Sequence, residues 1–282
     1  MMNRRNFVKT VSASAALVML APQTLMASGK INKIGIQLYS LRNQIGNDFL
    51  GTLRKIADAG YKIVEAAGYG DRKFYGYAPE EYKKIVTDLG MLPLSTHNGI
   101  SPENADTTIE DCKNAGMDYI VLPSIPAEKR KTLDDYRAIA GDFNRIGQKC
   151  SEAGIKFGYH NHAFEFEQID GQTPYDILLN NTDPNHVFFQ IDFFWVAYGG
   201  REPIEYLNNF PGRFALWHAK DMLDPLSKKN VEVGSGFIRF EEAFKVAGKA
   251  GLEYVVVEQE EFEMDPFVSI KKSFDYLNMQ KF

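Results

Sequence analysis

The sequence predicts an α/β fold, a single (β/α)8 barrel of the TIM type, and three observations support this. Short β-branched or aromatic runs recur about every thirty residues, a helical pattern follows each of them, and a glycine often ends the helix. The predicted strands are Lys33–Leu38, Lys62–Ala66, Leu92–His97, Tyr119–Leu122, Ile155–His160, Val187–Asp192, Phe214–His218 and Tyr254–Glu258. Strands that alternate with helices form a parallel sheet, and eight such units close most simply into a barrel. An open, doubly wound sheet is the alternative.

Glycines and helix-start residues mark where the elements end and begin. Asp48, Pro79 and Pro203 suit the starts of helices. The glycines that follow predicted helices are Gly60, Gly90, Gly116, Gly154 and Gly251, and the next strand starts within a few residues of each. No Gly-x-Gly-x-x-Gly motif follows the first strand, which weakens the dinucleotide-binding form of an open sheet.

The first residues have the parts of an export signal. Residues 3–9 are basic, residues 11–22 are weakly apolar, and Ala27 is a small residue at a suitable cleavage point. The apolar stretch is shorter than the ~20 residues that cross a bilayer as a helix. No cysteine follows it, so we expect neither a lipid anchor nor a stable membrane anchor.

The paired arginines at this start resemble the twin-arginine export motif, from which Asn3 and Val8 depart. We therefore expect a signal peptide at residues 1–27, a barrel domain at residues 28–282 and a periplasmic location. An amphipathic start to a cytoplasmic protein is the alternative.

Composition favours a protein that handles a small molecule. The chain has 282 residues, of which 44% are hydrophobic and 24% charged, and its formal net charge is −5. No run of basic residues marks a nucleic-acid surface, so we expect no nucleic-acid partner. Cys112 and Cys150 lie in predicted helices without metal-ligand spacing, which favours two buried free thiols over a disulfide.

Histidines and acidic groups stand where the predicted strands end. These positions hold Glu65, His97, His160 with His162, Gln190 with Asp192, His218 with Lys220, and Glu258. The carboxyl ends of all strands in such a barrel meet at one mouth, where active sites lie. Imidazole and carboxylate ligands converging there are typical of a divalent-metal site for Zn, Mn, Co or Fe.

Each of these residues also has a structural interpretation. His218 and His97 could be hydrogen-bonded core or loop residues, and Glu258 could be the solvated edge of an acidic stretch. Asp192 lies between Ile191 and Phe193, where a charge would be buried unless it is paired or metal-bound. The aromatic residues Tyr39, Phe193, Phe194 and Trp195 could form a wall for a sugar ring or pack in the core.

In this order and spacing, the motifs resemble the xylose-isomerase-like superfamily of sugar isomerases, epimerases and inosose dehydratases, which also includes class II apurinic endonucleases. The resemblance covers essentially the whole barrel. It depends on segments 35–40 (GIQLYS), 60–65, 158–162 (GYHNH), 190–192 (QID), 217–221 (WHAKD) and 233–236 (VGSG), and on Glu258. The resemblance implies a TIM barrel that binds one divalent cation, and family members often form dimers, so a homodimer is an option for this chain.

The resemblance carries three metal ligands over by position, namely Asp192, His218 and Glu258. The family's fourth ligand is a strand-five glutamate, and this chain has His160 at that position, with Glu165 as the other candidate. Neutral imidazole can still bind a metal. The epimerases of the family use the strand-five and strand-eight carboxylates as two bases, so symmetric two-base epimerisation becomes doubtful here.

The chemistry expected from this site is metal-assisted proton abstraction next to a sugar carbonyl through an enediolate, with Glu258 as general base. The proton's return to a neighbouring carbon gives isomerisation, and loss of a β leaving group gives a lyase or dehydratase acting on 3-keto-glycosides or inosose-type substrates. His97, His162 and Lys220 are expected to supply acid–base and charge stabilisation. Glu65 and Gln190 would bind hydroxyl groups of the sugar, and Trp195 would contact it.

Two other functions compete with this one. A sugar-binding barrel without catalysis would follow if the change at His160 abolished metal binding. An apurinic endonuclease would need three metals and a basic DNA surface, which the acidic composition disfavours. Export disfavours phosphorylated substrates, and Gly234-Ser235-Gly236 is the single candidate for a loop that cradles phosphate.

Overall fold

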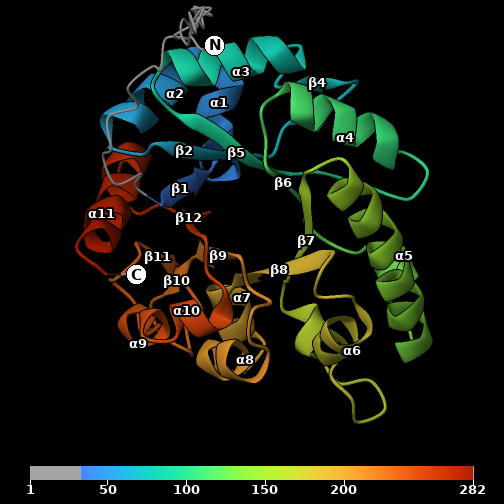
Figure 1. The fold of residues 1–282 in the computed structure, drawn as a ribbon. Coiled ribbons are helices and arrows are strands. Elements are labelled where there is room, and N and C mark those ends of the chain that lie inside the picture. The colour runs from blue at the N-terminus through green and yellow to red at the C-terminus, as the bar shows by residue number, and fades with distance from the viewer. Residues whose placement is uncertain (1–32, 282) are drawn as a thin grey trace, which may run out of the picture. The chain divides into compact units, whose positions relative to one another are not determined.

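A computed structural model describes residues 33–281 and shows a closed barrel of eight parallel strands (Figure 1). The strands are β1 (Ile34–Gln37), β2 (Ile63–Ala66), β5 (Leu92–His97), β6 (Tyr119–Leu122), β7 (Lys156–His160), β8 (Val187–Asp192), β9 (Leu216–Ala219) and β12 (Tyr254–Val257). Around the ring they follow the order β1-β12-β9-β8-β7-β6-β5-β2. Each predicted strand is therefore confirmed, and the first and last strands pair, which excludes the open sheet.

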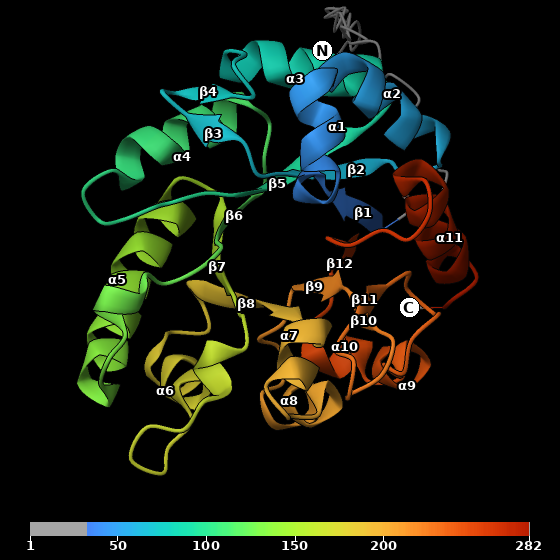
Figure 2. The ribbon, with the colours of Figure 1, turned by 180° about the vertical axis from the view of Figure 1, so that it is seen from behind.

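Helices surround the ring of strands in both ribbon views (Figures 1 and 2). They are α1 (Arg42–Asn47), α2 (Phe49–Asp58), α3 (Pro79–Asp88), α4 (Ala105–Asn114), α5 (Leu133–Glu152), α6 (Pro174–Asn181), α7 (Phe193–Tyr198), α8 (Pro203–Asn209), α9 (Phe240–Phe244), α10 (Ala247–Ala250) and α11 (Pro266–Asn278). Short 3-10 turns lie at η1 (Leu38–Leu41), η2 (Ala127–Lys129) and η3 (Phe164–Phe166).

The helix boundaries follow the signals in the sequence. The Asp48 carboxylate accepts a hydrogen bond from the Gly51 amide at 2.9 Å and caps α2. Pro79 and Pro203 open α3 and α8. Gly60, just after α2, has φ +109°, and a Cβ there would lie 2.6 Å from the ring of Phe274, so this turn requires glycine.

The inside of the barrel changes from apolar to polar along the strands. A buried cluster fills the end where the strands begin, and it comprises Ile63, Leu94, Tyr119, Val121, Phe188, Ala215 and Leu216. Residues two apart in a strand share a face. Ile63 is therefore followed inside the barrel by Glu65, and Leu216 by His218. This gradient places buried polar groups at the mouth.

Several features lie outside the main ring. Two short antiparallel hairpins, β3–β4 (Tyr69–Gly70 and Lys73–Phe74) and β10–β11 (Asp221–Met222 and Asn230–Val231), are not in the sequence prediction.

Cys112 and Cys150 are both buried and free, as expected.

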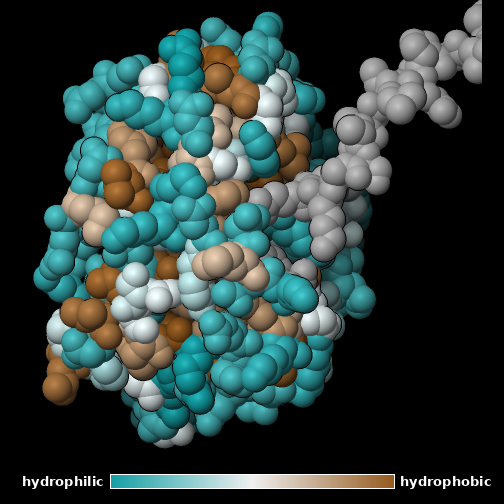
Figure 3. All heavy atoms as spheres, turned by 90° about the vertical axis from the view of Figure 1, so that its left-hand side faces the viewer, coloured by the Kyte–Doolittle hydropathy of each residue, from teal (hydrophilic) through white to brown (hydrophobic). Residues whose placement is uncertain are grey.

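One face of the barrel is largely polar. Polar residues cover most of the face in Figure 3, with apolar residues scattered among them. Between residues 33 and 281, no helix has both the length and the apolar character to cross a membrane. The export signal expected at residues 1–27 lies outside the described residues.

Candidate metal centre

Four buried side chains from consecutive strands of the ring converge at the mouth. His160 ends β7, Asp192 ends β8, His218 lies in β9 and Glu258 directly follows β12. One ligand atom from each lies within 4.8 Å of the others. Their exposed fractions are 2%, 0%, 0% and 5%. The structure thus brings together the four residues that the sequence predicts as metal ligands.

Some buried nitrogen and oxygen atoms of this group have no hydrogen-bond partner among the described residues. His218 Nδ1 lies 2.8 Å from Glu258 Oε2 and 3.8 Å from Asp192 Oδ2, and His160 Nε2 lies 3.4 Å from Asp192 Oδ2. Within the described residues, both ring nitrogens of His160 and Asp192 Oδ2 have no hydrogen-bond partner. Buried polar atoms without partners are costly. A cation bound among them would remove that cost, so these residues fit a divalent metal.

Local structure fixes the direction of the Asp192 carboxylate. Its Oδ1 accepts a hydrogen bond from the Trp195 amide at 2.9 Å and caps α7. The Asp192 amide in turn donates to Asn161 Oδ1 at 3.0 Å. These bonds leave Oδ2 directed toward His160 and His218, which is the orientation a ligand needs.

The charges of the group are strongly coupled. Burial opposes ionisation of Asp192, but contacts with His160 and His218 lower its pKa to about 2. Burial also opposes ionisation of Glu258, yet Lys220 and His218 hold its pKa well below the usual range. Burial lowers the pKa of His160 to about 4. At neutral pH the group therefore offers two carboxylates and the neutral imidazole of His160.

His218 and Glu65 form a second layer of contacts directly under this group. Burial disfavours a charged His218, but Glu65 and Glu258 raise its pKa well above the usual value. Burial likewise opposes ionisation of Glu65, while the charges of His97 and His218 lower its pKa to about 2. His218 Nε2 lies 2.6 Å from Glu65 Oε1. In the metal-free protein, the His218 imidazolium therefore bridges Glu65 and Glu258.

His97 and Gln190 belong to the same buried layer. His97 Nε2 lies 2.6 Å from Gln190 Oε1, and the His97 ring stacks on that of His218 at 5.1 Å between centroids. Gln190 Nε2 donates to Glu65 Oε2 at 2.9 Å. His97, His160 and His218 also offer ring nitrogens close enough for a metal, although the Gln190 contact occupies Nε2 of His97.

Lys220, Trp195 and His162 line the rim beside the metal group. The Lys220 ammonium is buried, forms an ion pair with Glu260, and lies 3.9 Å from Glu258 Oε2 and 4.7 Å from the centre of the Trp195 ring. Burial disfavours its charge, but the nearby carboxylates raise the pKa of Lys220. The His162 ring lies 5.3 Å from Trp195, and burial lowers the pKa of His162 to about 3. The rim thus combines a cation, a neutral imidazole and an aromatic face.

Glu165, the other sequence candidate for the strand-five ligand, lies outside the group of four. Its side chain is fully buried, accepts a hydrogen bond from the Tyr159 hydroxyl, and accepts another from the His162 amide at 2.9 Å. Burial raises the pKa of Glu165 to about 8. A protonated carboxyl held by these two contacts orients the His162 loop, and His160, rather than Glu165, belongs to the group that could hold a metal.

The backbone amides of the glycine-rich segment after β11 bind the Asp221 carboxylate. The Gly234 and Gly236 amides donate to Asp221 Oδ2 at 2.9 and 3.0 Å, and the Met222 amide donates to Oδ1 at 2.8 Å. A phosphate-binding loop needs such amides to point at the ligand. Here an internal carboxylate already occupies them.

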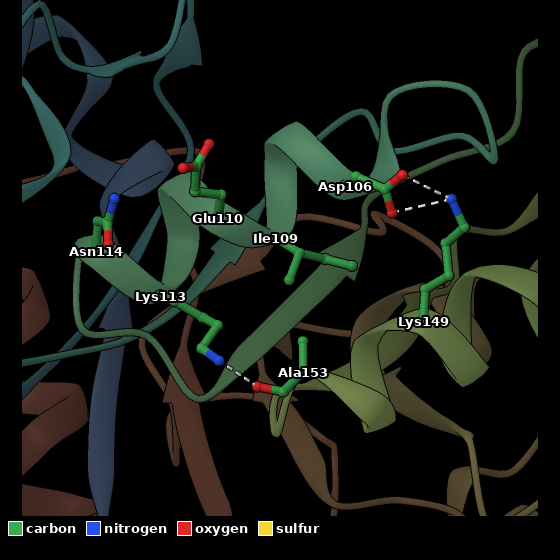
Figure 4. Close-up of a pocket in the computed structure, with 7 residues that line it drawn as sticks. All are labelled: Asp106, Ile109, Glu110, Lys113, Asn114, Lys149 and Ala153. Atoms are coloured by element: carbon green, nitrogen blue, oxygen red, sulfur yellow. Dashed lines mark hydrogen bonds and ion pairs between the residues drawn. The ribbon is translucent and has the colours of Figure 1, made fainter.

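A separate groove lies on the outside of the barrel, between α4 and α5 (Figure 4). Both of its lysines have partners within the groove, because Lys149 pairs with Asp106 at 2.9 Å and Lys113 donates to the Ala153 carbonyl at 2.5 Å. It contains no converging groups comparable to those at the mouth.

The sequence prediction missed four residues that hold the site together. Gln37 and Ser95 donate to Glu65, Asn161 holds Asp192, and Glu260 pairs with Lys220. Gln37, Glu65 and Ser95 are register partners on adjacent strands. Polar residues at equivalent depth in neighbouring predicted strands were the signal that could have identified Gln37 and Ser95.

The barrel is that of a known family. A family model described as "Xylose isomerase-like TIM barrel" matches residues 53–279, and the chain belongs to this family. A solved sugar phosphate isomerase/epimerase from Parabacteroides distasonis is 31% identical, with a TM-score of 0.76 over 91% of this chain and 97% of that one.

Two further comparisons are more distant. An inosose dehydratase from Geobacillus kaustophilus is 28% identical over 161 residues, which are 55% of this chain and 51% of the relative. The chain therefore spans about half the length of the curated relatives it matches. A solved structure of the IOLI protein with a zinc atom shares the fold at a TM-score of 0.66 and 14% identity, covering 87% of this chain and 96% of that one.

Proposed function

We propose that this protein is a divalent-metal-dependent enzyme that abstracts a proton next to the carbonyl of a neutral sugar. The observation that carries the proposal is the buried group of His160, Asp192, His218 and Glu258. Within the described part of the chain, both ring nitrogens of His160 and Asp192 Oδ2 lack hydrogen-bond partners and are free to bind a cation. A bound divalent cation supplies Lewis-acid chemistry, which acidifies the C–H bond next to a carbonyl and stabilises an enediolate.

The residues beside the group can move and stabilise the charge. Glu258 is ionised and lies at the edge of the group, so it is the proton acceptor. Lys220 is protonated, lies 3.9 Å from Glu258 Oε2, and can stabilise a developing oxyanion or donate a proton to a leaving group. His162 supplies a neutral imidazole at the rim. His97 would first have to break its contact with Gln190, so we assign it to packing against His218.

Two observations support a neutral substrate. The amides of Gly234 and Gly236 already bind Asp221, and Lys220 is already paired with Glu260, so neither offers a ready phosphate site. The half-buried Trp195 ring offers an apolar face to a sugar ring. A phosphorylated sugar converted much faster than its neutral form would overturn this part of the proposal.

A single catalytic carboxylate favours isomerisation by one base, with elimination as the second candidate. The strand-five position holds His160, and Glu165 nearby is protonated, so symmetric epimerisation by two carboxylates lacks its second base. Elimination is favoured by the adjacent Glu258 and Lys220, which could serve as base and acid. Product analysis separates the two, because isomerisation in D₂O labels a ketose or aldose, and elimination releases a leaving group.

Metal content of the purified protein is the first test. Elemental mass spectrometry should find about one equivalent of Mn, Zn, Co or Fe, and His218→Ala should lose it. His186→Ala is the matched control, because His186 precedes β8 at the opposite end of the barrel. Wild-type protein that stays metal-free after reloading and still binds sugars would overturn the proposal and favour a non-catalytic sugar-binding barrel.

Chemistry is tested by solvent exchange. The metal-loaded protein should incorporate deuterium from D₂O next to the carbonyl of a neutral keto-sugar or 3-keto-glycoside, and Glu258→Gln should abolish incorporation. Full exchange by Glu258→Gln would contradict the assignment of the base.

A further inference from the structure

The Glu65 carboxylate is surrounded by donors from four other strands of the barrel. Oε1 accepts hydrogen bonds from Gln37 Nε2 at 2.9 Å and His218 Nε2 at 2.6 Å. Oε2 accepts hydrogen bonds from Ser95 Oγ at 2.7 Å and Gln190 Nε2 at 2.9 Å. A carboxylate has about four lone-pair sites, so these four donors use its full capacity. The side chain is also completely buried.

This saturation leaves Glu65 with no free acceptor for a sugar hydroxyl. We propose that Glu65 is a positioning residue, which holds the His218 ring so that Nδ1 faces the metal group and thereby sets the affinity for the cation. This inference rests on the proposed function, because it assigns a role within the same site. It replaces the substrate contact that the sequence predicts for Glu65.

The donors around Glu65 are themselves oriented by outer contacts. Gln37 Oε1 accepts the Tyr39 amide at 3.0 Å, so the Gln37 NH₂ group must face Glu65. Gln190 Oε1 contacts His97 Nε2 at 2.6 Å, so its NH₂ group also faces Glu65. A reversed Gln37 amide would lose both of its contacts, and a reversed Gln190 amide would lose its hydrogen bonds to Glu65. The groups around Glu65 therefore donate to it from every side, and a carboxylate is the side chain that accepts all of these hydrogen bonds.

The orientation of His218 follows from this environment. Neutral imidazole carries its proton on either nitrogen, and the partner of one nitrogen decides which form is present. Glu65 lies at Nε2 and can only accept a hydrogen bond, so Nε2 keeps its proton. Nδ1 then has its lone pair directed toward Asp192 and Glu258. A carboxylate behind a histidine ligand also increases the basicity of the ligand.

Glu65→Gln tests this role with little change in shape. In competition with a chromophoric chelator, Zn²⁺ should bind this variant about 10–100-fold more weakly than wild type. Asp111→Asn is the matched control, because Asp111 is a buried carboxylate that contacts Arg72 and Tyr69, away from the mouth. Its zinc affinity should stay within about twofold of wild type.

A spectroscopic readout requires no variant. In the zinc-loaded wild-type protein, ¹H–¹⁵N NMR should show His218 with a proton on Nε2, at the low-field shift of a hydrogen bond to a carboxylate. A His218 ring protonated on Nδ1 would overturn the inference, even if Glu65→Gln failed to fold.

The affinity measurements separate this inference from the proposed function. Wild-type zinc affinity in Glu65→Gln, with a raised KM for sugar, would overturn the inference alone and return Glu65 to substrate binding. No zinc binding by the wild type would overturn both. Weaker zinc binding in Glu65→Gln, together with an unchanged Asp111→Asn, would support the positioning role.

Discussion

Replacement of Glu165 by glutamine should stabilise the protein more at high pH than at low pH. Glu165 is fully buried, and burial raises its pKa to about 8 from the ordinary value of 4.5. Between these two pH values, the unfolded chain has lost the proton that the folded protein keeps. Stability of the wild type therefore falls as pH rises through this window, and glutamine removes this dependence because it cannot ionise.

The size of the effect follows from the shift. One pKa unit corresponds to about 1.4 kcal/mol, so the full shift of Glu165 costs about 5 kcal/mol above pH 8. From pH 5.5 to 7.5, the free energy of unfolding of Glu165→Gln, minus that of the wild type, should rise by about 3 kcal/mol. The glutamine amide can still accept from the His162 amide and donate to the Tyr159 hydroxyl.

Urea denaturation at the two pH values measures this difference, with metal removed by chelator from every sample. Glu167→Gln serves as the control, since it makes the same replacement at an exposed position two residues away. A difference between Glu165→Gln and wild type that does not change with pH would refute the reasoning. Glu165 would then be ionised in the folded protein and would again be a candidate metal ligand.

The other predictions concern the mouth and its supporting loop. Burial disfavours the His218 imidazolium, but Glu65 and Glu258 raise its pKa, so zinc must displace a proton. Apparent zinc affinity should rise by up to about tenfold per pH unit, and calorimetry in buffers of different ionisation heat should detect proton release; no release would contradict this. Asp221→Asn should lower the free energy of unfolding by about 2–3 kcal/mol, because the amides of Gly234 and Gly236 lose hydrogen bonds to a charged acceptor. Urea denaturation measures this loss, and an unchanged midpoint would contradict the prediction. Sugar binding should change tryptophan fluorescence, and Trp195→Phe should abolish the change, because the other tryptophan is buried in the core; a change that persists would place the sugar elsewhere.

Much of the fold could be predicted because local and global signals agree. The β5, β6 and β8 strands have the predicted bounds, and the others differ by one or two residues at their ends. Helix caps such as Asp48 mark where helices begin, and glycines mark where helices end. These boundaries make the alternation of strand and helix visible in the sequence. The β3–β4 and β10–β11 hairpins were missed because two-residue strands carry too little pattern to detect.

The candidate site was only partly predictable. The carboxyl ends of the parallel strands meet at one mouth of the barrel. The sequence alone therefore predicts that His160, Asp192, His218 and Glu258 lie together. The contacts of Glu65 with Gln190 and His218 could not be predicted, since these two residues come from strands that do not pair with β2. The ion pair of Lys220 with Glu260 was missed for a similar reason, because the direction of the loop after β12 brings the two together.

Closure of the barrel has a consequence for how the protein matures. The ring closes where β1 pairs with β12, which joins the start of the barrel to nearly its end. Glu258 directly follows β12, so the last of the four candidate ligands arrives with the strand that completes the ring. A chain still emerging from the ribosome holds three of the four, together with two unpaired strand edges. Tight cation binding would therefore mark a chain that has finished folding.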